Sequence, residues 1–274
     1  MSETKKGRLF LGTQGFSFDD WVGPFYPEGT PKKAYLEAYV QHFPTVEIDS
    51  TFYGVPRETT IQSWHRRSPD DFLFSAKFPR LITHEKKLDR AIGDAEHFVQ
   101  TMNGLGDKLG VLTIQFAYDF TPDYFDRLDD FLGSLAEGPR YAVEVRNRAW
   151  LTPDFGEMLS NHNTALVLQD LHYMPKLDWI TADFTVIRWL GRRKDISEFD
   201  RIQIDRTEVL QKWAEKVDSF IDRGFDIYGY FNNHFAGHSP ASVRQFAEMV
   251  GVQLKPGGAE GRQPRQLSLG VEDD

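Results

Sequence analysis

Eight short apolar runs recur along the chain, each beside Gly, Pro, Asn or Asp. Their enrichment in Val, Ile, Phe and Tyr is typical of buried strands. Between them, apolar residues lie three and four positions apart, as in Leu210, Trp213 and Val217, which predicts amphipathic helices. Ser239 and Pro240 are typical first residues of a further helix. The predicted strands span residues 9–12, 45–49, 72–77, 111–115, 141–145, 165–170, 185–189 and 226–231.

Eight strands that alternate with helices predict one closed (β/α)8 barrel of the TIM type. The alternative is an open doubly wound sheet. The length of 274 residues favours the barrel, since single barrels commonly use about 250 residues. We expect the barrel domain to span residues 1–253 and the polar segment 254–274 to form a disordered tail.

The composition narrows the classes of function. The absence of Cys excludes disulfides, iron–sulfur clusters, thiolate zinc sites and a Cys nucleophile. No signal peptide and no stretch of about 20 apolar residues is visible, so we expect a cytosolic protein with no membrane partner. A formal net charge of −9 argues against an extended basic surface for nucleic acid but leaves local basic patches open.

Charged residues lie within several predicted strands, although a parallel barrel buries both faces of its strands. Alternation along each strand directs these side chains toward the barrel axis, mostly near the carboxyl ends, where active sites of this fold lie. Because an unpaired buried charge is costly, acids and bases there should form ion pairs. The inward charged residues are Glu47, Asp49, Lys77, Glu144, Arg146 and Arg188.

Two interpretations fit this polar interior. One is a network of ion pairs that only fills the barrel, because such networks also perturb pKa values. The other is an active site for acid/base chemistry on a small polar or anionic ligand, such as a sugar, a sugar phosphate or a nucleotide. The candidate catalytic residues are Glu47 and Glu144 as the acid and base, His84 as a proton shuttle, and Lys77 and Arg146 as holders of negative charge. The candidate substrate-binding residues are Gln14, Trp21, Asp49, Thr51, Tyr53, Gln115, Trp150, Asp170, Arg188, Gly191, Asn232 and Asn233.

Aromatic residues make up 14% of the chain, and one group of them follows the first, second and fifth predicted strands. Loops are normally polar, so this density predicts an aromatic wall that stacks against a ring of the ligand. The alternative is a hydrophobic plug that anchors the loops. The group comprises Phe16, Phe18, Trp21, Phe25, Tyr26, Phe52, Tyr53 and Trp150.

Basic residues follow the seventh predicted strand, at Arg192, Arg193 and Lys194. In a TIM-type barrel, the loops after strands seven and eight and a helix N-terminus often hold phosphate. The helix that begins at Ser239 would supply that terminus, so the pattern favours an anionic substrate. A solvated charge run is the alternative.

Metal binding is a second hypothesis. His84, His172 and His234 each follow a strand, and nearby carboxylates would complete a nitrogen–oxygen site for a divalent ion. His234 and His238 are four residues apart but precede the last helix, so they do not share a helical face. Such a site would suit a metal-dependent phosphodiester or nucleic-acid enzyme. A third hypothesis is a non-catalytic binding module, and no motif in the sequence requires a cofactor.

Several separated stretches give the chain a resemblance to the YecE-like proteins, domain of unknown function 72, over about residues 8–250. The stretches are GTQGFSFDDWVGPFYP, VEIDSTFYGVP, FLFSAKFPRLITH, AVEVRNRAW, TADFTVIRWLG and FNNHFAG. The resemblance implies a TIM-type barrel and no particular reaction. The motif positions that it implies are Gly12, Trp21, Glu47, Ser50, Thr51, Phe52, Tyr53, Lys77, Thr83, His84, Glu144, Arg146, Trp150, Arg188, Gly191, Asn232 and Asn233.

The chain departs from this family pattern at three places. Asp49 stands where Asn usually precedes the Ser-Thr-Phe-Tyr run, and residues 115–118 stand where a run similar to Gln-Leu-Pro-Pro is common. Leu190 stands where His is frequent, so a mechanism that uses that His would not transfer to this chain.

The predicted tail carries a second, shorter resemblance. Gln266, Leu267, Ser268 and Leu269 are similar to the start of the bacterial sliding-clamp-binding peptide, although Gly270 replaces its anchoring Phe. A sliding-clamp partner would place the protein in DNA metabolism.

Overall fold

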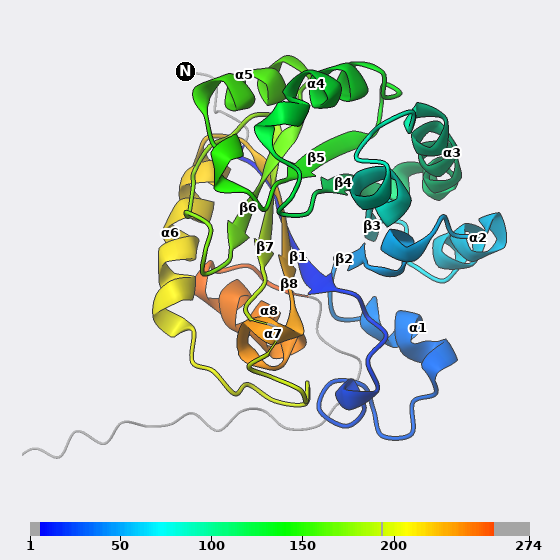
Figure 1. Ribbon diagram of the computed structural model, residues 1–274. Helices are drawn as coiled ribbons and strands as arrows, with labels where there is room; N and C mark the ends of the chain where they lie inside the picture. Colours follow the sequence, from blue (N-terminus) through cyan, green and yellow to red (C-terminus); the bar gives the residue numbers. More distant parts are fainter. Residues whose placement is uncertain (1–5, 193, 255–274) are drawn as a thin grey trace, which may run out of the picture.

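The computed structural model of the chain describes residues 6–192 and 194–254. Eight parallel strands close into a barrel in sequence order, with β8 hydrogen-bonded to β1 (Figure 1). This topology confirms the predicted (β/α)8 barrel, and the open doubly wound sheet is wrong. The strands are β1 Leu9–Gln14, β2 Thr45–Ile48, β3 Leu73–Lys77, β4 Leu109–Gln115, β5 Arg140–Glu144, β6 Ala165–Asp170, β7 Phe184–Trp189 and β8 Asp226–Phe231.

Helices surround the barrel and follow most strands (Figure 1). Residues 171–183, between β6 and β7, contain no helix. The α-helices are α1 Tyr35–Tyr39, α2 Glu58–Arg66, α3 Ile92–Met102, α4 Phe125–Gly133, α5 Pro153–Asn161, α6 Thr207–Asp222, α7 Asn233–Ala236 and α8 Ser239–Met249. Shorter 3-10 turns are η1 Asp19–Trp21, η2 Lys32–Ala34, η3 Ser50–Tyr53, η5 Asn103–Lys108, η6 Pro122–Tyr124 and η7 Arg148–Trp150, and η4 Leu81–Glu85 is a π turn.

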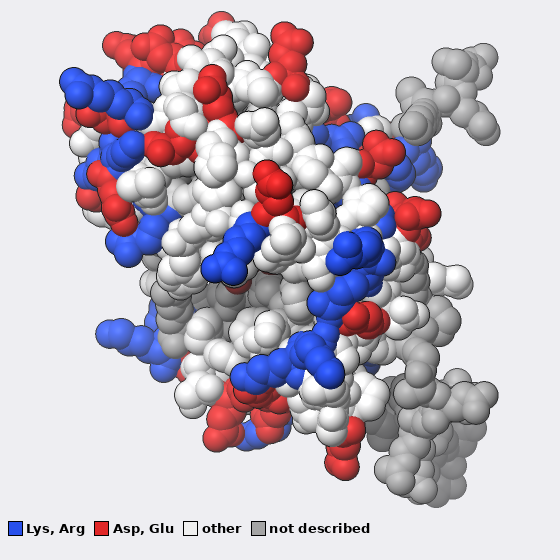
Figure 2. All heavy atoms as spheres, turned by 90° about the vertical axis from the view of Figure 1, so that its right-hand side faces the viewer, with Lys and Arg blue, Asp and Glu red and all other residues white. Residues whose placement is uncertain are grey.

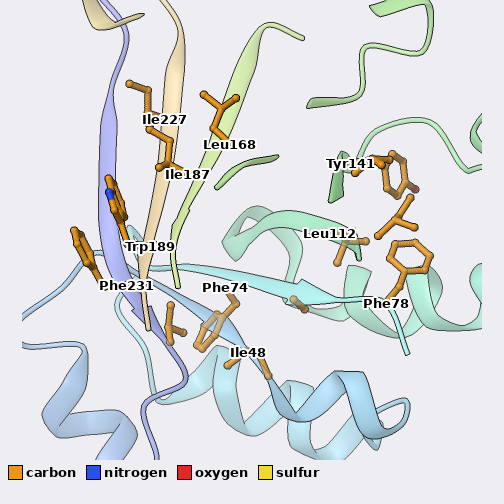
Figure 3. Close-up of a cluster of buried hydrophobic side chains, with 14 of the residues drawn as sticks. Ile48, Phe74, Phe78, Leu112, Tyr141, Leu168, Ile187, Trp189, Ile227 and Phe231 are labelled. Carbon is orange, nitrogen blue, oxygen red and sulfur yellow. The ribbon is translucent and has the colours of Figure 1, made fainter. Parts of the chain in front are cut away.

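The two faces of the strands contribute to two separate apolar layers. The larger layer lies between the strands and the helices, and Figure 3 shows part of it, including Ile48 and Ile187. The smaller layer fills the barrel interior and includes Val186. Because side chains alternate along a strand, Glu47 and Arg188 point into the barrel, beside these outward isoleucines. The interior is therefore apolar toward the amino ends of the strands and charged toward their carboxyl ends.

No helix in the described part of the chain is long and apolar enough to cross a bilayer. Residues 255–274, which make up nearly all of the predicted tail, lie outside the described residues. The clamp-like run at residues 266–269 lies there too, so the disorder of the tail and the clamp partner stay predictions.

Candidate functional site

A cavity of about 870 Å³ opens at the carboxyl ends of the strands. Its lining includes residues from the ends of all eight strands or from the loops that follow them. Active sites of TIM-type barrels are built on this face, because eight loops converge there above a rigid barrel. The cavity therefore lies where active sites of this fold are built.

A buried ion-pair network lies at the base of this cavity, centred on Arg188. The Nη2 atom of Arg188 donates to Glu47 Oε2 at 2.8 Å. Its Nη1 atom donates to Glu144 Oε2, and to Gln115 Oε1 at 3.2 Å. Arg146 forms a further ion pair with Glu144. One guanidinium thus joins the ends of β2, β4 and β5 to β7 across the barrel.

The two glutamates differ in how readily they hold a proton. Burial raises the pKa of Glu47, and the nearby Arg188 and Lys77 only partly oppose this effect. Burial acts on Glu144 in the same direction, but Arg146 and Arg188 together outweigh it and hold the pKa of that carboxyl below its usual range. Glu144 is therefore the firmly ionised carboxylate of the pair, and Glu47 is the one that protonates more easily.

A second ion pair lies at the cavity wall formed by β2 and β3. Lys77 pairs with Asp49, and Lys77 Nζ lies 5.5 Å from the centroid of the Phe52 ring. The Lys77 side chain is only 11% exposed, so the carboxylate and the ring together hold its ammonium in place. The cavity thus contains a fixed cation close to the loop after β2.

His84 enters the cavity from η4, and π turns are frequent at functional sites. The centroids of the His84 and Phe52 rings are 5.0 Å apart. Thr83 Oγ1 lies 2.8 Å from His84 Nδ1 and donates to the Pro79 carbonyl oxygen at 3.5 Å. The Thr83 hydroxyl is thus the hydrogen-bond partner of Nδ1, whichever ring nitrogen carries the proton. Burial lowers the pKa of His84, which favours the neutral imidazole.

Comparison with known proteins places the chain in a family. The family model described as "Protein of unknown function DUF72" matches residues 10–266. The chain belongs to the DUF72 family. It is 22% identical to UPF0759 protein YunF of Bacillus subtilis, over 95% of this chain and 99% of YunF. It is 34% identical to UPF0759 protein YecE of Escherichia coli, over 51% of this chain and 48% of YecE.

Solved structures agree with this membership. A DUF72 family protein from Thermotoga maritima superposes with a TM-score of 0.74 at 27% identity, covering 89% of this chain and 99% of that one. D-psicose 3-epimerase from Clostridium cellulolyticum superposes with a TM-score of 0.52 at 9% identity, and the match covers 88% of this chain and 95% of the epimerase chain. A glycoside hydrolase family 5 enzyme from Prevotella bryantii superposes with a TM-score of 0.50 at 10% identity, and the match covers 90% of this chain and 96% of the hydrolase chain. These last two similarities show the barrel fold alone.

Most of the predicted site residues of this DUF72 protein meet at one cavity. Glu47 and Glu144 are fully buried behind Arg188 and Arg146 and do not line it. Direct proton transfer between either glutamate and a ligand therefore stays a prediction. The predicted residues that line the cavity are Gln14, Asp49, Tyr53, Lys77, His84, Gln115, Arg146, Arg188, Gly191 and Asn232.

The expected aromatic wall is mostly a plug. Trp21 and Trp150 are fully buried in the layer between strands and helices and do not line the cavity. The Nε1 atom of Trp150 donates to the Phe120 carbonyl oxygen at 2.7 Å, and the two rings stack at 5.4 Å. From the predicted aromatic group, Phe52 and Tyr53 are the members that line the cavity. The rings of Trp21 and Trp150 anchor loops instead of lining the cavity, so their contact with a substrate stays a prediction that this burial does not favour.

Thr51 and Asp170 are also outside the cavity lining. Thr51 Oγ1 donates to the carbonyl oxygen of Ile48 and accepts from the backbone N–H of Lys77, so it ties the ends of β2 and β3 together. Asp170 turns toward α6, where it accepts from Trp213 Nε1 at 2.7 Å. Both polar groups already have structural partners, so their contact with a substrate stays a prediction.

The N-terminus of α8 is closed to a phosphate. Asn233 Oδ1 accepts from the backbone N–H of Ser239 at 2.9 Å and from its hydroxyl at 2.7 Å. Ser239 is fully buried, and Asn233 does not line the cavity. This capping does not favour a phosphate contact at the helix, and the ligand contact of Asn233 stays a prediction. Arg192 and Lys194 do line the cavity, whereas Arg193 lies outside the described residues.

Some lining residues were not predicted from the sequence. Tyr118, Tyr173 and Asp195 line the cavity from the loops after β4, β6 and β7. Tyr118 is 69% exposed and Tyr53 is 80% exposed, so most of the surface of each side chain is accessible to solvent. The only available signal was an aromatic or charged residue soon after a strand end. This signal is weak evidence that a residue lines the cavity, because the direction of its side chain depends on the length of the loop.

Histidines do not gather into a metal site. In residues 6–192 and 194–254, no group of three or more His, Asp and Glu side chains is arranged to hold a metal ion. His84, His172 and His234 line the same cavity without forming such a group. His238 instead packs edge-on against Trp21, with centroids 6.1 Å apart. The metal hypothesis therefore has no ligand set in this part of the chain.

Replacing Gly191 with alanine should distort the cavity wall. Gly191 has φ +67°, and a Cβ there would lie 1.9 Å from the His234 carbonyl oxygen and 2.7 Å from Phe235 Cα. Both neighbours are backbone, so the loop after β7 must move. We expect a loss of more than about 1 kcal/mol in the free energy of unfolding, measured by chemical denaturation. Gly29→Ala is the matched control, with φ +75° and no atom within 4 Å, and equal losses would contradict the role of close packing.

Proposed function

We propose that this protein is an enzyme that performs acid/base chemistry on a small anionic ligand at the carboxyl ends of the barrel strands. One observation carries the proposal: His84, with its lowered pKa, and the Asp49–Lys77 ion pair face a single cavity rich in Lys and Arg. Titratable groups with perturbed pKa values in a cleft are typical of active sites. The closed barrel beneath them would hold such groups rigidly.

The charge of the lining supports an anionic ligand. Among the described residues, the cationic side chains outnumber the acidic ones, Asp49 and Asp195. Figure 2 shows Lys and Arg side chains around a hollow, with acidic side chains interspersed. A local positive lining on a chain of net charge −9 favours a small anion over a long polyanion such as nucleic acid. The cationic lining residues are Lys77, Arg146, Arg188, Arg192 and Lys194.

His84 and Lys77 suit complementary roles. A neutral imidazole can remove a proton from the ligand or from a water molecule. The ammonium of Lys77 can then stabilise the negative charge that develops on the ligand. This chemistry covers an isomerase-type proton transfer and a hydrolase-type attack by water. Sugar phosphates and nucleotides are the small anions to test first, because their charge suits the Lys and Arg side chains of the lining.

A thermal-shift screen tests the class of ligand. The protein is heated with sugar phosphates, nucleotides, and the uncharged sugars and nucleosides from which they derive. We expect the anionic compounds to raise the unfolding temperature, because a ligand that binds only the folded state stabilises it. Stabilisation by the uncharged compounds alone would contradict an anionic ligand.

The variant His84→Gln tests the mechanism on any ligand that is turned over. We expect kcat to fall at least about a hundredfold, the usual contribution of a general base. Because burial lowers the pKa of His84, wild-type activity should rise with pH below neutrality and level off once the imidazole is deprotonated. The exposed His97→Gln on α3 is the control. A His84 variant with normal turnover and the same acidic limb would remove His84 from the mechanism.

A non-catalytic binding module is the second candidate function. The observation that favours it is the mutual pairing of Arg188, Glu47 and Glu144, which fills the barrel without a ligand. Ligands that stabilise the protein but are never converted would support it. The metal-dependent phosphodiester enzyme stays a separate hypothesis, and elemental analysis of protein purified without an affinity tag tests it.

A further inference from the structure

A chain of hydrogen bonds sets the orientation of two side-chain amides at the cavity wall. The backbone N–H of His234 donates to Asn232 Oδ1 at 2.9 Å. Because a backbone N–H can only donate, Asn232 must turn its oxygen toward it and its Nδ2 away. Asn232 Nδ2 then donates to Gln14 Oε1 at 2.9 Å. The Gln14 amide is therefore left with its donor atom, Nε2, for another partner.

That donor has no hydrogen-bond partner among the residues that the structure describes. Gln14 Nε2 is buried and makes no hydrogen bond, although Gln14 is 2% exposed and lines the cavity. Asp49, at the end of the neighbouring strand, pairs with Lys77 instead. Buried donors are normally paired in folded proteins. Other buried donors among the described residues, such as Trp21 Nε1, also lack a partner, but Gln14 differs from Trp21 because it lines the cavity. A ligand oxygen in the cavity would supply the missing acceptor.

The surroundings of Gln14 select an acceptor with negative charge. The loop after β7 lies beside this amide pair, since Gly191 packs against the carbonyl oxygen of His234. Arg192 and Lys194 from that loop line the same cavity. Arg188 contributes a second buried donor without a partner, its Nε atom. Hydrogen bonds between such donors and an ionised acceptor are stronger than bonds between neutral groups.

We propose that Gln14 Nε2, together with Arg192 and Lys194, forms a subsite for the oxyanion group of the ligand, a phosphate or a carboxylate. The subsite lies on the side of the cavity formed by β7, β8 and β1. The barrel order places β7 across from β3, which carries Lys77 and leads to His84. The ligand thus spans the cavity, with its charged group at Gln14 and its reacting part at His84. The proposal rests on the proposed function for the negative charge of the ligand and for the place of its reacting part at His84.

Inorganic phosphate and acetate are the probes that test this subsite on the full chain. Each is titrated into isotope-labelled protein while the side-chain amide signals of Gln14 and Asn232 are followed by NMR. We expect the Gln14 Nε2 signal to shift and saturate. Gln14→Leu removes the donor, and Gln14→Glu replaces it with a carboxylate oxygen, so both should weaken binding at least about tenfold. Saturation by phosphate alone would assign a phosphate group, and saturation by acetate alone a carboxylate.

Gln211→Glu is the control, because it adds the same charge on the exposed face of α6. It should bind both probes as the wild type does. If both Gln14 variants bind the probes as tightly as the wild type, the subsite is overturned while the role of His84 stands. If the wild type binds neither probe, the subsite and the anionic ligand both fail. If Gln14→Glu does not fold, Gln14→Leu and the wild-type amide signals decide the question.

Discussion

Replacing Arg188 with methionine is expected to lower the free energy of unfolding by about 3–5 kcal/mol. Methionine fills much of the same space but donates no hydrogen bond. Glu47 and Glu144 would then be fully buried without the guanidinium that both share. Glu47 would lose its ion-pair partner, and Glu144 would keep only Arg146. A buried carboxylate without its partner is costly, because its lost hydration is no longer compensated. Chemical denaturation of the variant and the wild type at neutral pH measures the difference.

The pH dependence of this loss checks its cause. Glu144 has a lowered pKa in the folded protein, so its contribution to stability is present above the unfolded-state pKa and is lost as the pH falls through the folded-state value. The penalty for losing Arg188 should therefore shrink in acid. Arg192→Met, an exposed arginine at the same cavity, should change stability by less than about 0.5 kcal/mol. An equal effect of the two variants would mean that Arg188 does not compensate ionised glutamates.

Replacing Trp150 with alanine should lower the free energy of unfolding by about 3–5 kcal/mol. The indole is fully buried, stacks on Phe120 and packs against Phe155 at 5.0 Å. Truncation would leave a large cavity and would also free the carbonyl oxygen that accepts from its Nε1. Denaturation measured by intrinsic fluorescence and by circular dichroism gives the loss.

Tyr53→Ala is the contrasting variant, because it removes a ring that follows a strand in the same way but is 80% exposed. Its stability should stay within about 0.5 kcal/mol of the wild type. Any ligand whose ring stacks on Tyr53 should nevertheless bind the Tyr53→Ala variant more weakly than the wild type. Equal stability losses at Trp150 and Tyr53 would contradict the division of the aromatic group into a buried plug and an open rim.

The charged interior could be predicted because a strand has a strict period of two. Once residues 45–49 and 185–189 are identified as strands, outward Ile48 and Ile187 direct Glu47 and Arg188 into the barrel. Opposite charges in a buried interior must pair, so the ion pairs followed from the same argument. The sequence did not predict which acid pairs with which base, because that depends on how each strand is staggered against the others.

The loop residues could not be sorted in this way. Trp150 and Tyr53 both follow strands, yet one is buried and the other open, because the packing of helices and neighbouring loops decides which ring has room beneath it. The N-terminus of α8 could not be judged from the sequence either. Its access to a phosphate depends on Asn233, whose side-chain oxygen accepts the hydrogen bond of the Ser239 backbone N–H. No local pattern encodes that hydrogen bond.

The sequence by itself determined the eight-stranded barrel, the inward charges and the face on which a site would lie, because these depend on local periodicity and on the cost of unpaired buried charge. The tertiary structure decided which residues reach the cavity. The structure buries Glu47 and Glu144 behind arginines and brings His84 and Lys77 to the cavity wall. Within the described residues, it leaves the Nε2 donor of Gln14 without a hydrogen-bond partner. The physical reason is that burial, hydrogen-bond direction and ion-pair geometry depend on residues far apart in the chain.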